Sequence, residues 1–223
     1  MSEITQNLIF ILVAGIIVAG IFFFTGRAKK QKEAAFVKMA AEQGWMYQSL
    51  NDRLTRGFRL QASNWTFETL AKFADREAGP GSVNVSYQTR WWTGEKSLPG
   101  RLAFIGPRTS AGNMNIPGAA MLMQMALPMM LGDQSSLAAG LSEVQTGSDA
   151  LRQRYMIMAH DPADMSNLLS DALERALLGW PAGSLPVIKQ SPNGLLIEIN
   201  NFEAKKPSDV QAVINLGKIL QIR

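Results

Sequence analysis

The side chains that could perform catalysis are few and scattered. The chain has 223 residues, a single histidine, His160, and no cysteine. Structural zinc sites draw on clusters of Cys and His, so the sequence predicts neither a metal site nor thiol chemistry. As a general base His160 would need an orienting acid and a nucleophile. Asp161 adjoins it, but no G-x-S-x-G elbow is present. A membrane-bound hydrolase is therefore the least supported class.

Phosphate-binding loops and catalytic acid pairs give no stronger signal. The sequence contains neither G-x-x-x-x-G-K-[ST] nor G-x-G-x-x-G. Asp161 and Asp164 fall in the first turn of a predicted helix, where acids interact favourably with the helix dipole. We therefore predict a protein that is not an enzyme and uses no cofactor.

The most informative stretch is Leu8–Phe24, which has no charged residue and holds thirteen Leu, Ile, Val or Phe residues. Extended back to Ile4 as a helix, it would measure about 31 Å, enough to cross a bilayer once. A cleaved signal peptide is the alternative, but no Lys or Arg precedes the run and Thr25-Gly26-Arg27 is a poor cleavage site. Residues 1–26 are thus predicted to be a retained transmembrane anchor. The lipid-facing residues we expect are Leu8, Phe10, Ile16, Ile17, Phe22, Phe23 and Phe24.

Small residues within this span suggest a helix-packing face. Gly15 and Ala19 form a small-xxx-small pair, which lets two membrane helices approach closely. Gly and Ala are also common in any membrane helix, so the pair is a candidate contact with another membrane protein subunit.

The positive charge of the chain is concentrated just after the anchor. The formal net charge is +4, and residues 27–38 alone hold five basic residues and one acid, which leaves the remainder neutral. The sequence therefore predicts no nucleic-acid face. The positive-inside rule places the N-terminus outside and the domain in the cytoplasm, at a bacterial inner membrane. The residues expected to contact anionic lipid, or only to fix this topology, are Arg27, Lys29, Lys30 and Lys32.

Residues 106–150 are poor in charge and rich in methionine. Six of the twelve methionines fall between Met114 and Leu131, in a run interrupted by Pro117 and Pro128. Such a segment could be buried core, a partner surface or a loop at the membrane interface, and flexible methionine suits an adaptable contact. We expect partner contacts through Met121, Met123, Met125, Met129 and Met130.

The Trp91-Trp92 pair is a second candidate contact. On a strand the two rings face opposite sides, so one lies outside the local core unless both faces are covered. Tryptophan is a common binding anchor and interfacial residue, and burial on both faces is the alternative.

The remaining pattern predicts an α+β domain with an antiparallel sheet and packed helices. The expected division is a transmembrane anchor at 1–26, a basic juxtamembrane helix at 27–44, and a domain at 45–223 with the methionine-rich insertion at 106–150. Helices are expected at 28–43, 161–179 and 208–221. The first has an apolar stripe of Phe36, Met39 and Ala40 and should end at Gly44. The second should have Asp161 as its N-cap and Pro162 at its first position. The third should have a Ser208–Gln211 capping box and bury Val210, Val213, Ile214 and Leu220.

Strands are expected at 45–50, 58–62, 65–73, 82–92, 102–105, 152–159, 186–190 and 195–200, although Leu70, Phe73 and Ala74 also fit a helix. The strand at 102–105 is expected to return beside the strand at 82–92 in an antiparallel meander. Ser191-Pro-Asn-Gly194 predicts a hairpin, through Asn-Gly, between the last two strands.

Several of these patterns resemble uncharacterised bacterial membrane-anchored proteins. The resemblance lies in Tyr155-Met-Ile-Met-Ala-His-Asp161, Leu168-Leu169, Gly194-Leu-Leu196 and Tyr87-Gln-Thr89, and covers residues 40–105 and 150–222. It implies no reaction and no site residue. We expect a non-catalytic accessory or scaffold subunit of a larger membrane assembly; a lipid or apolar-ligand binding domain at the membrane surface is the alternative.

Overall fold

A computed structural model describes residues 27, 30–73, 85–108 and 131–222. The predicted anchor, the insertion between 109 and 130, and Lys29 lie outside these residues. Within them, no helix combines the length and the apolar character that crossing a bilayer requires.

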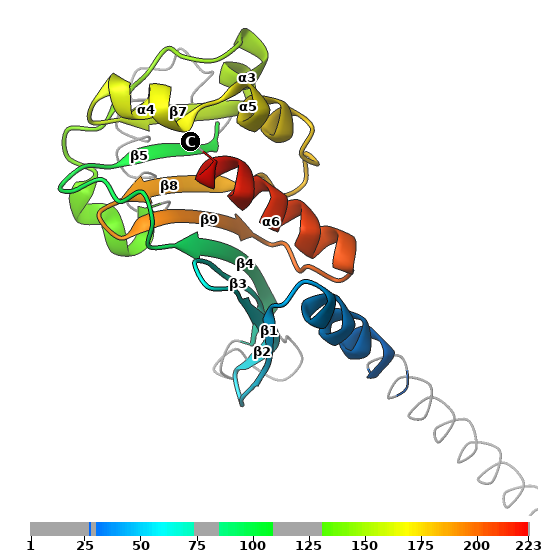
Figure 1. Cartoon of the computed structure of the whole chain (residues 1–223). Coiled ribbons are helices and arrows are strands. Elements are labelled where there is room, and N and C mark those ends of the chain that lie inside the picture. The colour runs from blue at the N-terminus through cyan, green and yellow to red at the C-terminus, as the bar shows by residue number, and fades with distance from the viewer. Residues whose placement is uncertain (1–26, 28–29, 74–84, 109–130, 223) are drawn as a thin grey trace, which may run out of the picture.

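The described part of the chain has an α+β fold, as predicted, and is built on one antiparallel sheet of nine strands (Figure 1). The strands follow the order β1-β2-β3-β4-β9-β8-β5-β7-β6. Their bounds are β1 Met46–Asn51, β2 Thr55–Gln61, β3 Thr66–Phe73, β4 Val85–Thr93, β5 Ala103–Pro107, β6 Ser142–Glu143, β7 Tyr155–Ala159, β8 Val187–Ser191 and β9 Gly194–Asn200.

The described helices are a stem helix over residues 30–42, the 3-10 helix η2 and four α-helices. Their bounds are η2 Gly132–Leu137, α3 Asp149–Arg154, α4 Pro162–Leu168, α5 Asp171–Leu178 and α6 Pro207–Gln221.

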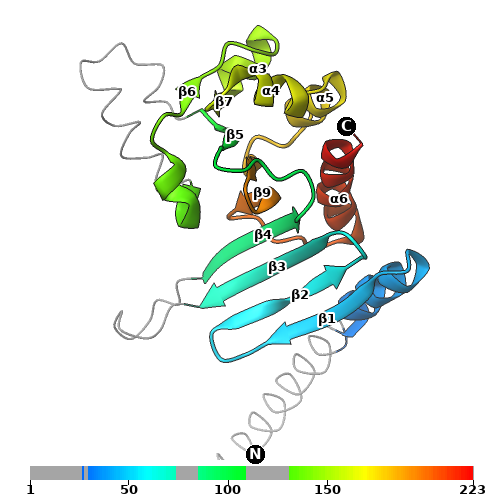
Figure 2. The ribbon, with the colours of Figure 1, turned by 60° about the vertical axis from the view of Figure 1, so that its left-hand side comes forward.

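The hairpin of β8 and β9 lies inside the sheet, between β4 and β5. The predicted meander holds for β1 to β4, which form consecutive antiparallel pairs (Figure 2). The expectation that β5 would pair with β4 is wrong, because β9 pairs with β4 and β8 pairs with β5. The hairpin predicted at Ser191–Gly194 is confirmed, with Ser191 paired to Gly194. Its two turn residues are Pro192 and Asn193, and not the expected Asn193 and Gly194.

One face of the sheet carries the main core and the helices. Alternate strand residues such as Phe67, Trp91 and Ile197 are fully buried there, together with Val213 and Ile214 of α6. The stem helix contributes Phe36 and Ala40, the apolar stripe that the sequence predicts, and ends as expected at Gly44, whose φ of +68° suits glycine. The stem helix and α6 thus lie over the same face (Figure 1).

The opposite face has a small second core and a row of charges. Leu131, the last residue of the methionine-rich run, is 2% exposed and packs there with Phe104 and Met158. On neighbouring strands, Arg59, Glu68, Arg90 and Glu198 stand side by side and alternate in sign. We call these four residues the charge row. Its pairs Arg59–Glu68 and Arg90–Glu198 close at 2.6 and 3.1 Å.

Two predictions about element ends are wrong for identifiable reasons. Residues 152–154 belong to α3, which Ser148 caps, and the strand begins only at Tyr155. The helix expected at 161–179 is split, because Ser170 caps a second helix by accepting the Leu173 N–H. Asp161 does cap α4, with Pro162 at its first position, as predicted.

The cap of α6 also differs from the expected Ser208–Gln211 box. Lys206 is the N-cap residue, and the Asp209 carboxylate accepts the backbone N–H groups of Lys205 and Lys206, each at 3.0 Å. The pattern of the helix itself is confirmed, since Val210, Val213, Ile214 and Leu220 are all buried.

Candidate functional site

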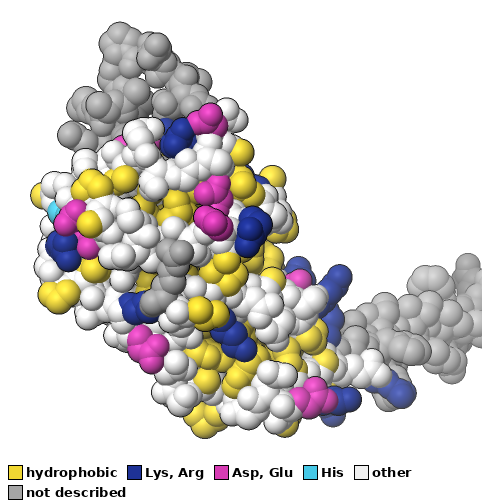
Figure 3. Space-filling model, turned by 45° about the horizontal axis from the view of Figure 1, so that its top comes forward, with side chains coloured by type: hydrophobic (Ala, Val, Ile, Leu, Met, Phe, Trp, Pro, Cys, Tyr) yellow, Lys and Arg dark blue, Asp and Glu magenta, His cyan; other side chains and the backbone are white. Residues whose placement is uncertain are grey.

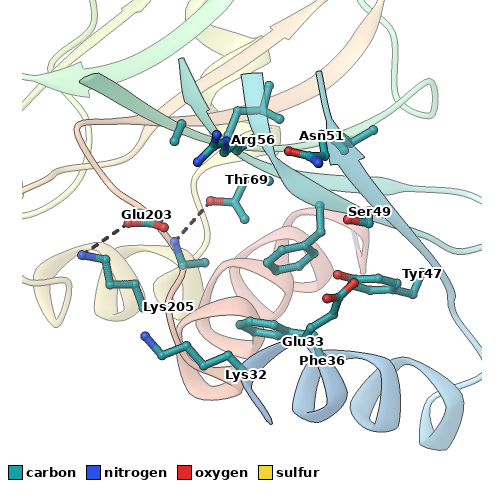
Figure 4. Close-up of a pocket in the computed structure, with 16 residues that line it drawn as sticks. Lys32, Glu33, Phe36, Tyr47, Ser49, Asn51, Arg56, Thr69, Glu203 and Lys205 are labelled. Atoms are coloured by element: carbon teal, nitrogen blue, oxygen red, sulfur yellow. Dashed lines mark hydrogen bonds and ion pairs between the residues drawn. The ribbon is translucent and has the colours of Figure 1, made fainter. Parts of the chain in front are cut away.

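A pocket of about 570 Å³ opens between the stem helix and the sheet (Figure 4). We call it the stem pocket. Its walls come from the stem helix, from β1 to β3, and from the segment that leads into α6. The lining residues are Lys32, Glu33, Phe36, Tyr47, Ser49, Leu50, Asn51, Arg56, Gly57, Phe58, Thr69, Leu70, Ala71, Glu203, Ala204 and Lys205. Its volume falls within the usual range for small-molecule sites.

An aromatic cluster forms the floor of the stem pocket. The rings of Phe36 and Phe58 lie 4.4 Å apart between centroids, and Tyr47 stacks on Phe58 at 5.7 Å. Both phenylalanines are 6% exposed, so the cluster is part of the core and holds its shape. It offers a fixed apolar surface to a ligand.

A chain of hydrogen bonds fixes the wall formed by residues 202–204. The Ala204 N–H donates to Thr69 Oγ1, the two threonine hydroxyls are 2.9 Å apart, and Thr89 Oγ1 donates to the Phe202 carbonyl. Each hydroxyl has one proton, and that of Thr89 is used on Phe202. Thr69 must therefore donate to Thr89, which sets one direction for the whole chain.

Cationic side chains surround the aromatic floor. Lys32, Arg56 and Lys205 line the pocket against two acids, Glu33 and Glu203. Lys205 Nζ lies 3.3 Å from the Glu203 carboxylate (Figure 4). Lys32 has no ion-pair partner within the part of the chain that the structure describes.

Tyr47 supplies a neutral phenol to the same pocket. Burial raises the pKa of its hydroxyl, and the nearby Glu33 charge raises the pKa further, while the hydrogen bond with Ser49 acts in the opposite direction. Tyr47 is therefore protonated at physiological pH and can donate a hydrogen bond to a bound acceptor.

A second hollow, of about 370 Å³, adjoins the stem pocket at Phe36 and Lys32. We call it the lysine groove. It is lined by Gln31, Lys32, Ala35, Phe36, Lys205, Lys206 and Pro207, none of which is acidic. The two hollows share Lys32, Phe36 and Lys205. Lys and Arg side chains gather where the stem helix leaves the domain (Figure 3).

The structure brings only part of the predicted contact set into this region. Lys32 lines both hollows, whereas Lys30 is exposed on the same helix and lines neither. Arg27 is exposed. The anchor residues, Gly15, Ala19, Lys29 and the five methionines lie outside the described residues, so these contacts stay predictions.

The two tryptophans have separate environments. Trp91 is fully buried, with its ring against Gly217 of α6, and so packs the core of the domain. Trp92 lies on the opposite face and is partly exposed. Of the pair, only Trp92 has surface left for a partner.

His160 and its neighbours serve the fold. The Leu102 N–H donates to Nδ1 at 2.9 Å, and Nε2 lies 2.9 Å from the Ala139 carbonyl oxygen, which requires a proton on Nε2. Both ring nitrogens are thus engaged by backbone groups. Asp161 and Asp164 both pair with Arg101, each at 3.2 Å. No group of three or more potential metal ligands occurs among the described residues.

Most of the stem pocket could not be predicted from the sequence. Arg56 and Lys205 are separated by about 150 positions, and only the strand pairing and the course of the chain into α6 bring them together. The one usable signal was Phe36, an apolar residue on a basic helix, because the apolar face of that helix had to pack against the domain.

In the comparisons with known proteins, no family model, no curated protein and no solved structure matched this chain. The resemblance to uncharacterised bacterial membrane-anchored proteins therefore stays a prediction.

Proposed function

We propose that this chain is a non-catalytic binding protein of the membrane surface, and that its stem pocket takes an amphiphilic ligand. The observation that carries this proposal is the combination of a buried aromatic floor with a cationic rim in one pocket. An apolar moiety would rest on Phe36, Phe58 and Tyr47. A polar or acidic end would meet Lys32, Arg56 and Lys205.

The position of the pocket supports a membrane ligand. Six residues lead from the end of the predicted anchor at Gly26 to Lys32, and even a fully extended chain of that length spans at most about 21 Å. We further propose the topology that the charge pattern favours: one membrane span, an outer N-terminus and a cytoplasmic domain at a bacterial inner membrane. The pocket would then open close to the inner leaflet.

A photocrosslinking experiment tests this function. The full chain would be placed in nanodiscs containing phospholipids with a photoreactive group in one acyl chain. Adducts would then be mapped by mass spectrometry. We expect adducts on peptides that carry the pocket residues. Ser49→Trp, which fills the pocket, should abolish them.

The matched control lies one residue away. Gln48 is exposed on the opposite face of β1, so Gln48→Trp adds the same side chain outside the pocket and should keep the adducts. Equal labelling of both variants, or no labelling of pocket peptides in the unmodified chain, would contradict the proposal.

A second candidate function is an accessory or scaffold subunit of a membrane assembly, and the edge strand β1 favours it. Its six residues, MYQSLN, include no charge and no proline, and Met46 is 61% exposed. Natural edge strands usually carry charged side chains or proline, which hinder pairing with another chain. The occupant we propose is an extended segment of a second membrane subunit that adds a strand to β1.

The absence of cysteine from the sequence makes this testable. Gln48→Cys, labelled with a photoreactive maleimide, would be the only reactive thiol. Irradiation in intact membranes should give one adduct of defined mass, and Asn193→Cys at the exposed β8–β9 turn should not give it. A chain that remains monomeric and unlabelled from both positions would exclude β1 as the contact.

A further inference from the structure

The lysine groove differs from the stem pocket in the balance of its charges. Three lysines line it, Lys32, Lys205 and Lys206, and no acid does. Lys205 is also paired, at 3.3 Å, with Glu203, which lines the stem pocket but not the groove, so Lys32 and Lys206 supply most of the positive charge of the groove. The stem pocket, by contrast, sets three cations against Glu33 and Glu203. A negatively charged group would therefore be attracted to the groove side of Phe36.

The backbone holds two of these lysines in place. Asp209 accepts the N–H groups of both Lys205 and Lys206, so its carboxylate orders the segment from which their side chains project. The third lysine comes from the stem helix, which is fixed to the sheet by the burial of Phe36 and Ala40. The three ammonium groups thus come from two elements whose backbones are held in place on the domain.

The shared residues join the two hollows into one two-part site. Phe36 belongs to the aromatic floor and also lines the groove, and Lys32 and Lys205 border both. A ligand whose apolar part lies against Phe36 would extend its other end toward the lysines. An amphiphile with an anionic end matches this arrangement.

We propose that the lysine groove binds the phosphate of an acidic phospholipid headgroup, and that the apolar part of the same lipid enters the stem pocket. This inference rests on the proposed function and adds the charge of its ligand. A lipid is favoured as the source of the phosphate because the groove lies within reach of the predicted anchor and adjoins an apolar pocket. Each lysine near an anionic surface contributes about 1 kcal/mol, or about fivefold in binding.

The test compares two lipids and two lysines on the same helix. The full chain in phosphatidylcholine nanodiscs would receive a few mole per cent of photoreactive phosphatidylglycerol or photoreactive phosphatidylcholine. We expect the acidic probe to label peptides around Phe36 and Pro207 at least fivefold more strongly. Lys32→Gln should lower this labelling about fivefold, and Lys205→Gln with Lys206→Gln should lower it further.

Lys30→Gln is the matched control. The substitution removes the same charge two residues closer to the predicted anchor. Because Lys30 lines neither hollow, labelling should stay within about twofold of the unmodified chain. Equal losses in Lys30→Gln and Lys32→Gln would show general attraction to the surface and would overturn the groove. Thermal unfolding of each variant would confirm that the exposed substitutions leave the fold intact.

The remaining outcomes separate the two proposals. Equal labelling by both lipid probes, abolished by Ser49→Trp, would keep the stem pocket and reject the anionic subsite. No labelling of pocket peptides by either probe would reject both. Binding of inorganic phosphate, measured by calorimetry and weakened by Lys32→Gln, together with no preference for the acidic lipid probe, would identify free phosphate as the occupant and overturn the lipid assignment.

Discussion

Gly217 of α6 lies directly against the indole of Trp91 in β4. A Cβ atom added at Gly217 would come within 2.3 Å of Trp91 Cε2, far closer than atoms can pack. The helix therefore approaches the sheet at a point where only glycine fits. This contact joins α6 to the centre of the sheet, and it accounts for a glycine inside a helix where alanine would otherwise be preferred.

Gly217→Ala should lower the free energy of unfolding by about 2–3 kcal/mol, because the overpacking outweighs the gain of up to about 1 kcal/mol in helix propensity. Gly183→Ala is the matched control, since a Cβ there meets no atom within 4 Å. Urea unfolding followed by tryptophan fluorescence would measure both variants. A Gly217→Ala chain as stable as the unmodified one would contradict the contact.

The buried ion pair beside the charge row gives a second prediction. Lys189 is 3% exposed and lies 3.1 Å from Glu198 Oε2. Burial raises the pKa of Glu198, but the charges of Lys189 and Arg90 and their hydrogen bonds outweigh it, so its pKa is lowered overall. Lys189→Met should lower the free energy of unfolding by about 1.5–3 kcal/mol, because the buried charge of Glu198 loses one of its two cationic partners and keeps only Arg90.

A double mutant separates that penalty from loss of the pair itself. Lys189→Met with Glu198→Gln should recover a large part of the lost stability. Because the pKa of Glu198 is lowered on folding, its contribution is complete above the ordinary glutamate pKa and is lost as the pH falls through the folded value. Glu198→Gln alone should therefore flatten the acid limb of a plot of unfolding free energy against pH.

Tyr155 should make the domain sensitive to alkali. Burial raises the pKa of its hydroxyl to about 12, and the Arg154 cation only partly opposes this. Between about pH 10 and pH 12, the folded chain keeps the phenolic proton that the unfolded chain has lost. The contribution of the neutral phenol to the free energy of unfolding is therefore complete below about pH 10 and is lost by about pH 12. We expect about 1.4 kcal/mol per pH unit in between.

Replacement of the phenol tests this directly. Tyr155→Phe loses a hydrogen bond to the Leu177 carbonyl, at 3.3 Å, but should reduce the alkaline slope by that amount. Unfolding free energies measured at pH 9, 10 and 11 would show the difference, with Tyr87→Phe on β4 as a comparison. An unchanged slope in Tyr155→Phe would refute the assignment.

The threonine pair behind the stem pocket gives a fourth prediction. Thr69→Val would leave the buried Ala204 N–H without its acceptor, which costs about 1–3 kcal/mol. The same change should loosen the wall of the pocket and weaken photolabelling by lipid. Thr69→Ser keeps the hydroxyl and should preserve most of both properties. A Thr69→Val chain that labels normally would show that the wall does not depend on this bond.

Features of the fold that depend on residues close together in the sequence could be predicted, whereas features that depend on residues far apart could not. Alternating residues placed most strands, and the apolar face of α6 was correct at Val210, Val213, Ile214 and Leu220, because such patterns are local. The pairing of β9 with β4 was missed, since the nearest strand in sequence is the usual partner. The break at Ser170 was missed because the apolar spacing runs through it without interruption.

The candidate site was less accessible to prediction than the fold. Lys32 was expected to contact anionic lipid as one of several basic stem residues, and nothing in its neighbourhood distinguished it from Lys30. The distinction comes from helix rotation, since residues two apart point to opposite sides. Lys205 and Lys206 were not expected at all, because they reach the stem only through the path that the chain takes between β9 and α6.

The place of the C-terminal hairpin has a consequence for synthesis on the ribosome. Until residues 187–200 have been translated, β4 and β5 each lack one neighbour, and the nascent chain holds two unpaired strand edges at the middle of its future sheet. Trp91 must also wait for Gly217, which is translated later still. The domain can therefore close only after β9 and α6 have been translated, and chains that stop short of β9 should aggregate or be degraded.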